Sequence, residues 1–147
     1  MAVYPESRQD KFAMKITGGC HCGNIKYEAE AKPENAMICH CTDCQILSGS
    51  AFRTLLLTNE EAFNFTSGQP KIYIKIADSG KKREQTFCPE CGSPIYSASF
   101  GDEPREYAIR LGTVDQRDVI EPRKQIWCSS AHNWIKNICS WPAQDGE

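Results

Sequence analysis

Seven of the nine cysteines in this sequence lie close to another cysteine, at spacings that suit the binding of a metal ion. Four of them form two pairs, a C-x-C pair of Cys20 and Cys22 and a C-x2-C pair of Cys88 and Cys91. Residues two apart on an extended backbone share a face, and the tight turn of a C-x2-C segment directs both sulfurs toward one ion. Because zinc takes about four ligands in a tetrahedron, the two pairs together predict a closed, structural zinc site.

The third group places three cysteines, Cys39, Cys41 and Cys44, within six residues. An extended backbone aligns Cys39 with Cys41, and a turn that begins at Asp43 returns Cys44 to them. Structural zinc sites are closed, whereas catalytic zinc sites keep one position for water or substrate. Three local thiols without a fourth ligand beside them therefore indicate a second, open zinc site, which is the candidate catalytic centre.

Two further cysteines, Cys128 and Cys139, leave an alternative open, because either could close the second site and make it structural. Against this, isolated cysteines more often serve as small buried hydrophobic residues. His21 and His40 each stand between two cysteines, so an extended backbone directs their side chains away from the metal. We interpret both histidines as supporting or surface residues rather than ligands.

The composition is that of a globular protein without a bulk affinity for nucleic acid or membranes. The chain has 40% hydrophobic and 24% charged residues and a net charge of −2, so no nucleic-acid partner is expected. No apolar stretch approaches the ~20 residues of a transmembrane helix, and residues 1–15 lack the features of a signal peptide. We therefore expect the protein to be cytoplasmic. Because thiols are kept reduced in the cytoplasm, its cysteines are expected to bind metal rather than to form disulfides. The oligomeric state is left open.

The elements that must position these groups have mainly the periodicity of strands. Strand patterns are found in residues 25–29, 52–57, 72–76, 107–111 and 125–127. Among them, Ile72, Ile74 and Ile76 share one face, and residues 52–57 suit a buried strand. Helical signals are short: Asp43 is expected to cap one turn that ends at Gly49, and Ser129 or Ser130 a second turn.

These elements predict a mainly β domain over residues 15–147 with short helical turns, preceded by a flexible tail over residues 1–14.

The cysteine motifs resemble those of the glutathione-dependent formaldehyde-activating enzyme family, which also includes centromere protein V. The resemblance runs, in order, through GGCHCGNIKY, CHCTDCQ with SGSAF, and FCPECGSPIY. A weaker likeness follows in LGTVD and around Trp127 and Trp134. Family members often have a histidine where this chain has Gln125.

The resemblance implies a β-tent fold of antiparallel sheets that holds two zinc ions. It assigns the two cysteine pairs to the structural zinc and the three-cysteine group to the catalytic zinc. The implied activity joins formaldehyde to glutathione to give S-hydroxymethylglutathione, and in the reverse sense it is that of a carbon–sulfur lyase. Three thiolates leave a zinc site with a formal charge of −1, which suits holding an incoming thiol as thiolate better than making hydroxide.

Three residues are candidates for contact with the substrate. Ser48 is a candidate proton donor, Arg53 a candidate partner for a glutathione carboxylate, and Trp134 a candidate apolar wall. A salt-bridged Arg53 and a core Trp134 are the structural alternatives. Two competing functions are a non-catalytic, zinc-stabilised binding module and, with less support, metal storage or redox sensing by the three-cysteine group.

Overall fold

A computed structural model of the chain describes residues 13–101 and 104–147. In this part of the chain two β-sheets, several short 3-10 helices and one α-helix are found, which confirms the predicted mainly β fold. Residues 1–12 of the expected tail lie outside the described residues, whereas Met14, also assigned to the tail, begins the first strand.

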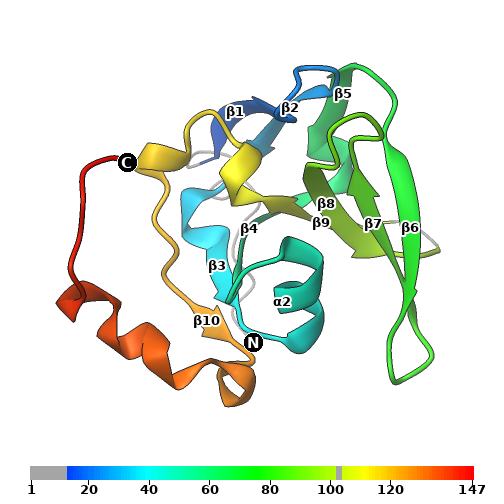
Figure 1. The fold of residues 1–147 in the computed structure, drawn as a ribbon. Coiled ribbons are helices and arrows are strands. Elements are labelled where there is room, and N and C mark those ends of the chain that lie inside the picture. The colour runs from blue at the N-terminus through cyan, green and yellow to red at the C-terminus, as the bar shows by residue number, and fades with distance from the viewer. Residues whose placement is uncertain (1–12, 102–103) are drawn as a thin grey trace, which may run out of the picture.

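The smaller sheet has three antiparallel strands. It consists of β1 (Met14–Gly19), β2 (Lys26–Ala31) and β5 (Phe63–Ser67), in the order β1-β2-β5. Tyr27, Ala29 and Ala31 of β2 are buried and alternate with exposed residues, as expected for a sheet with one face in the core. In Figure 1 these three strands lie at the top of the molecule, above the larger sheet.

The larger sheet has seven strands in the order β10-β3-β4-β9-β8-β7-β6. Their bounds are β3 (Ala36–Cys39), β4 (Arg53–Asn59), β6 (Lys71–Ile76), β7 (Lys82–Phe87), β8 (Pro94–Ser99), β9 (Glu106–Arg110) and β10 (Gln125–Ile126). All pairs are antiparallel except β10 with β3. Each predicted strand is present, and Ile72 and Ile76 of the edge strand β6 lie at the surface.

The two faces of the larger sheet have different surroundings. Leu56 of β4 and Ile109 of β9 are opposite each other and fully buried, in a core that also contains Tyr27 and Phe63 of the smaller sheet. The neighbouring residues Leu55 and Arg110, also opposite each other, point to the other face because side chains alternate along a strand. One face therefore packs the core, and the other is left for a site.

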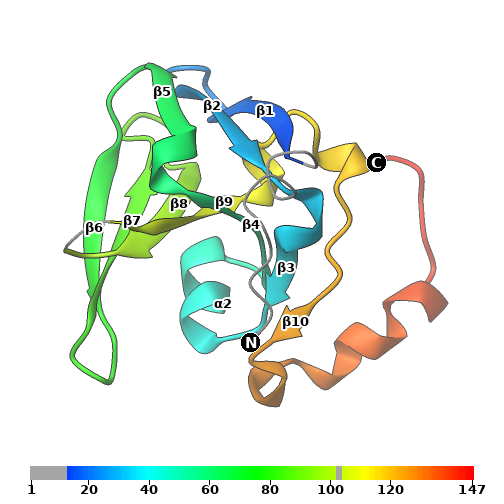
Figure 2. The ribbon, with the colours of Figure 1, turned by 180° about the vertical axis from the view of Figure 1, so that it is seen from behind.

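The α-helix α2 (Thr42–Ser48) follows β3 and lies beside β4, as Figure 2 shows from behind. The prediction that Asp43 caps it is wrong. Cys41 is the N-cap, and its sulfur accepts a hydrogen bond from the backbone N–H of Cys44, which satisfies a donor that the first turn leaves free. Gly49, with a φ of 64°, ends the helix as expected.

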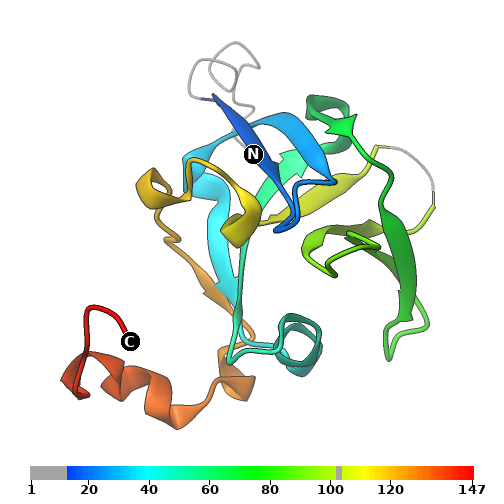
Figure 3. The same cartoon turned by 45° about the horizontal axis from the view of Figure 1, so that its top comes forward.

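The C-terminal segment forms two 3-10 helices, Cys128–Ser130 and Asn133–Ser140, and extends along one side of the molecule (Figure 3). Their N-caps are Trp127 and His132 rather than Ser129 or Ser130, so that prediction is wrong. Trp127 turns the chain through a left-handed conformation, with φ of 56°, and both serines then fall inside the first helix. No helix in the described part of the chain is long and apolar enough to cross a membrane.

Candidate metal centres and the adjoining cavity

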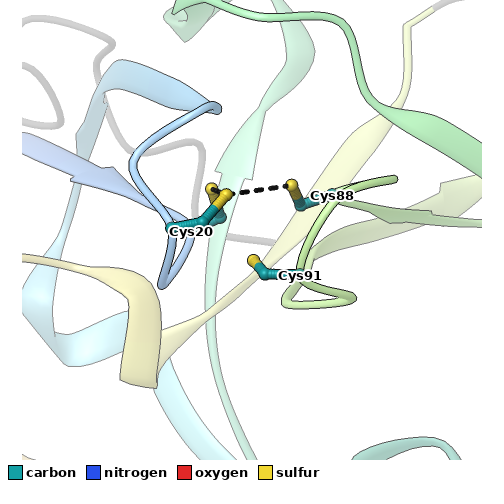
Figure 4. Close-up of side chains that lie close together, drawn as sticks. Cys20, Cys88 and Cys91 are labelled. Carbon is teal, nitrogen blue, oxygen red and sulfur yellow. Dashed lines mark hydrogen bonds between the residues drawn. The ribbon is translucent and has the colours of Figure 1, made fainter.

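The two cysteine pairs come together in one group of four. The sulfurs of Cys20, Cys22, Cys88 and Cys91 all lie within 4.8 Å of one another, and Figure 4 shows the labelled Cys20, Cys88 and Cys91 thiols pointing into a common space. The Cys20 and Cys22 sulfurs are 3.5 Å apart, and those of Cys22 and Cys88 are 3.8 Å apart. A tetrahedron of thiolates about 2.3 Å from zinc has sulfurs about 3.8 Å apart. The four-cysteine group therefore fits zinc.

Backbone donors surround the sulfurs of the four-cysteine group. The N–H of Ile25 donates to Cys20 Sγ at 3.1 Å, and that of Glu90 donates to Cys88 Sγ at 3.4 Å. Burial opposes ionisation of Cys20, but the hydrogen bond from Ile25 contributes to lowering the pKa of its thiol and so favours the thiolate. Gly92, with a φ of 78°, turns the chain so that its N–H donates to Cys88 O at 2.8 Å, a conformation that a side chain disfavours.

The three-cysteine group is built from a single short segment. Cys39 ends β3, Cys41 caps α2 and Cys44 lies in its first turn, and their sulfurs lie within 4.8 Å of one another. No fourth histidine, cysteine or carboxylate of the described residues joins them at that distance. Cys128 and Cys139 are both exposed and are not members of this group.

The electrostatics of this group also fit a bound cation. Burial, and then the neighbouring sulfurs of Cys41 and Cys39, raise the pKa of the Cys44 thiol. Burial likewise raises the pKa of Cys39. Three crowded thiols cannot all be ionised unless a positive charge lies between them, so the donor set is suited to a divalent metal ion such as zinc.

A cavity of about 420 Å³ adjoins the three-cysteine group, and the free face of the larger sheet forms its floor. Its apolar walls are contributed by Met37, Leu47, Leu55, Leu57, Ile126 and Trp127. Its cations are Arg53, Lys75, Arg83 and Arg110. Among the described residues, Trp127 is the one non-glycine with a positive φ, and strained backbone of this kind is frequent at functional sites.

The register of the strands places the cysteines and two arginines on the same face. Cys39 of β3 is directly opposite Arg53 of β4, and Leu55, two residues further along β4, is opposite Arg110 of β9. Arg53 and Arg110 are both 6% exposed, and Arg53 Nη1 lies 3.9 Å from Cys44 Sγ. Burial, and then the charge of Arg53, lower the pKa of Arg110 to about 9.

Of the three predicted substrate contacts, Arg53 lines this cavity, whereas Ser48 and Trp134 do not. Arg53 is a lining residue, as the prediction requires, and it has no carboxylate partner among the described residues. Ser48 donates its hydroxyl to Gln45 O at 3.4 Å, and Trp134 is stacked on His132 and Trp141. Neither Ser48 nor Trp134 is among the described residues that line the cavity.

A glutamine that sequence analysis did not single out connects the C-terminal segment to the three-cysteine loop. Gln45 donates through Nε2 to the carbonyl oxygens of His40 and Ser130, at 2.9 and 3.1 Å. Its Oε1 accepts from His132 Nε2 at 2.9 Å. His40 is itself buried, and its Nε2 bonds Gln125 Oε1 at 2.8 Å. His40 therefore supports the loop that carries the cysteines, and its side chain is directed away from their sulfurs.

Fold and site together define a mainly β domain with two clusters of cysteine thiols that could each hold a metal ion. One of the clusters lies beside a cavity lined by cations. The family model described as glutathione-dependent formaldehyde-activating enzyme matches residues 15–130, and the chain belongs to that family. A crystal structure of a Rhodobacter sphaeroides protein from a structural genomics programme is similar in fold, with a TM-score of 0.57 and 19% sequence identity. The alignment covers 74% of this chain and 98% of that chain.

Proposed function

We propose that this protein joins formaldehyde, or a similar small aldehyde, to glutathione and catalyses the reverse cleavage as a carbon–sulfur lyase. Membership of the family supports glutathione and formaldehyde as the substrates. We further propose that zinc occupies both cysteine groups. The observation that carries the catalytic assignment is that Cys39, Cys41 and Cys44 supply three sulfurs and border a cavity large enough for a small substrate.

The reaction forms two bonds, S–C and O–H, and breaks two, S–H and the π bond of the carbonyl group, so it needs no oxidant or reductant. The thiol sulfur bonds to the carbonyl carbon, the π bond of the carbonyl group breaks, and the thiol proton ends on the new hydroxyl oxygen. A zinc ion held by the three cysteines supplies the positive charge that favours the thiolate form of the substrate.

The residues of the chain bind and orient the two substrates. Arg53, beside the Cys44 sulfur, attracts an anionic group to the reacting end of the cavity. Met37, Leu55 and Ile126 give the cavity apolar walls, which limit water around the reacting atoms. Ser48 and Trp134 stay predictions as substrate contacts; for Ser48 this requires its hydroxyl to leave Gln45 O.

The test combines metal analysis with exchange spectroscopy on the whole protein. Elemental analysis should find two zinc ions for each chain, and X-ray absorption should show seven sulfur ligands shared between them, with a lighter atom completing one site. Two-dimensional NMR exchange between formaldehyde hydrate and S-hydroxymethylglutathione should be faster with the zinc-loaded protein than with buffer alone. A fourth protein ligand at the three-cysteine group would contradict the catalytic assignment.

The same measurements separate the competing functions. If the protein binds two zinc ions but accelerates exchange for no combination of thiol and aldehyde, the result supports the alternative function, a zinc-stabilised binding module. A protein that accelerates exchange for another aldehyde but not for formaldehyde keeps the lyase mechanism and changes the substrate.

A further inference from the structure

The floor of the cavity holds two buried guanidinium groups without a carboxylate partner. The ion pairs of the described residues join Lys75 to Asp43 and Arg105 to Glu60 and Glu84, and neither Arg53 nor Arg110 takes part. The Nε atoms of both arginines are buried without a hydrogen-bond partner. Burial of an unpaired charge is unfavourable, so this arrangement indicates an anion that the chain itself does not supply.

Local contacts hold Arg110 in one orientation. Its Nη2 donates to Gln85 Oε1 at 2.9 Å, and its Nη1 donates to the carbonyl oxygen of Ala108 at 3.3 Å. Arg53 lies diagonally across from it on the neighbouring strand, on the same face of the sheet. Diagonal neighbours of this kind have Cα atoms about 7–8 Å apart, within reach of long side chains. Both guanidinium groups can therefore reach the same small anion.

A second cavity, of about 330 Å³, is lined by the same two arginines. It shares Leu47, Arg53, Gln85 and Arg110 with the cavity beside the cysteines and continues toward Phe87 and Pro94. The arginine pair is consequently accessible from both cavities. A substrate longer than formaldehyde can place its reacting end at the cysteines and the rest of the molecule beyond the arginines.

The charges around the first cavity do not balance without a further anion. Four cations and two carboxylates, those of Asp43 and Glu106, line it, which leaves an excess of two positive charges. Three thiolates around a divalent metal ion contribute one negative charge. Arg53, in contact with Cys44 Sγ, accounts for that charge. Lys75 is paired with Asp43, so Arg83 and Arg110 share the single remaining carboxylate, that of Glu106, and one positive charge is left over.

We propose that Arg110 acts together with Arg53 to bind a carboxylate of the substrate and is thereby a specificity-determining residue. This inference rests on the proposed function, since it assigns the anion to a substrate of the same site. Two guanidinium forks suit the planar, bidentate geometry of a carboxylate. The carboxylate belongs either to the thiol, as in glutathione, or to an aldehyde that carries one, as in glyoxylate.

The test uses zinc-loaded protein and the variants Arg110→Gln and Arg110→Lys. Isothermal titration calorimetry measures the binding of glutathione and of glutathione diethyl ester, in which both carboxylates are masked. NMR exchange compares formaldehyde with glyoxylate as the aldehyde. Arg117→Gln is the matched control, because Arg117 bonds Val114 O and is not among the described residues that line either cavity.

If the thiol carries the carboxylate, Arg110→Gln weakens glutathione binding about 10- to 100-fold and leaves the diester unaffected. If the aldehyde carries it, the variant binds both thiols as the wild type does and selectively loses acceleration with glyoxylate. In either case Arg110→Lys, which keeps the charge but not the fork, lies between wild type and Arg110→Gln. An equal effect on every probe, or no effect on any, overturns the proposal.

The wild-type protein alone provides a second test, which is decisive if Arg110→Gln fails to fold. Equal affinity for glutathione and its diester, together with equal acceleration for glyoxylate and formaldehyde, overturns the carboxylate site. A wild-type protein that prefers the carboxylate-bearing probes in binding, yet accelerates no exchange reaction, retains the carboxylate site and refutes the proposed function. The two failures are therefore distinguishable.

Discussion

The two cysteine groups contain the same kind of ligand atom but differ in the parts of the chain that they join. The four-cysteine group connects the turn after β1 with the turn between β7 and β8, and so ties the smaller sheet to the larger one. The three-cysteine group comes entirely from the end of β3 and the start of α2. A metal ion bound by the first group would therefore stabilise the whole fold, whereas one bound by the second would organise a single loop.

The surroundings of the two groups differ as well. In the four-cysteine group, the closed group, backbone N–H groups of Ile25 and Glu90 donate to the sulfurs, and Cys20 and Cys88 belong to the hydrophobic core. The three-cysteine group, the open group, has the guanidinium of Arg53 as a neighbour and a cavity beside it. The difference supports the proposal that this chain uses cysteines for stability at one place and for chemistry at another.

The largest expected effect comes from breaking the closed group with Cys88→Ser. Cys88 is fully buried, and structural zinc sites have apparent binding free energies of about 10–16 kcal/mol, as large as the whole stability of a domain. We expect little or no folded protein, measured by circular dichroism and by zinc content. Cys128→Ser, at an exposed cysteine outside both groups, is the control and should melt like the wild type.

Breaking the open group should instead abolish activity while the fold persists. Cys41→Ser suits this test, because serine can still cap α2 in place of the sulfur that accepts from Cys44 N–H. We expect one zinc ion for each chain, a loss of at least ~100-fold in the exchange rate, and a change in unfolding free energy of about 1 kcal/mol or less. An inactive variant that is also unfolded would mean that the two groups do not differ as proposed.

A smaller effect is expected from the glutamine that joins the C-terminal segment to the open group. Gln45→Ala removes the hydrogen bonds to His40, Ser130 and His132, each worth about 1 kcal/mol. Limited proteolysis should cleave the C-terminal segment faster, with a decrease in global stability of up to about 3 kcal/mol. Gln116→Ala, which removes side-chain hydrogen bonds to Thr17 elsewhere, should leave the cleavage rate unchanged.

Sequence reasoning could identify the cysteine groups because the geometry of each pair or triplet is local. Alternation on extended backbone and the tight C-x2-C turn are sufficient to bring neighbouring sulfurs together. It could not identify the cavity, because Arg110 reaches Arg53 only through the pairing of β9 with β4, two segments far apart in the chain. The available signal was a cation in the otherwise apolar strand 107–111.

Helix caps were predicted less well, for a different physical reason. The usual caps are serine, threonine, aspartate and asparagine, which favoured Asp43, Ser129 and Ser130. In the structure the thiol sulfur of Cys41 takes that role: it accepts from the backbone N–H of Cys44 and at the same time lies within 4.8 Å of the sulfurs of Cys39 and Cys44. A local preference was thus overridden by the position that the ligand requires.

The smallest expected effect compares two glycines that both have a left-handed conformation, one next to the four-cysteine group and one at the end of the helix that follows the three-cysteine group. Gly92 follows Cys91 with a φ of 78°, and Gly49 ends α2 with a φ of 64°. An added Cβ meets no neighbouring atom at either position. Alanine should therefore cost about 1 kcal/mol at both, from the left-handed backbone alone.

The two variants should differ in how the metal responds. In Gly92→Ala the strain falls on the turn that carries Cys88 and Cys91, so less chelator should unfold the protein. In Gly49→Ala the strain falls beyond the three ligands, at the far end of α2, and the chelator concentration that unfolds the protein should change only by the common backbone cost. Chelator titrations followed by circular dichroism measure both. Equal sensitivity in the two variants would show that the closed group does not couple metal binding to folding more strongly than the open group does.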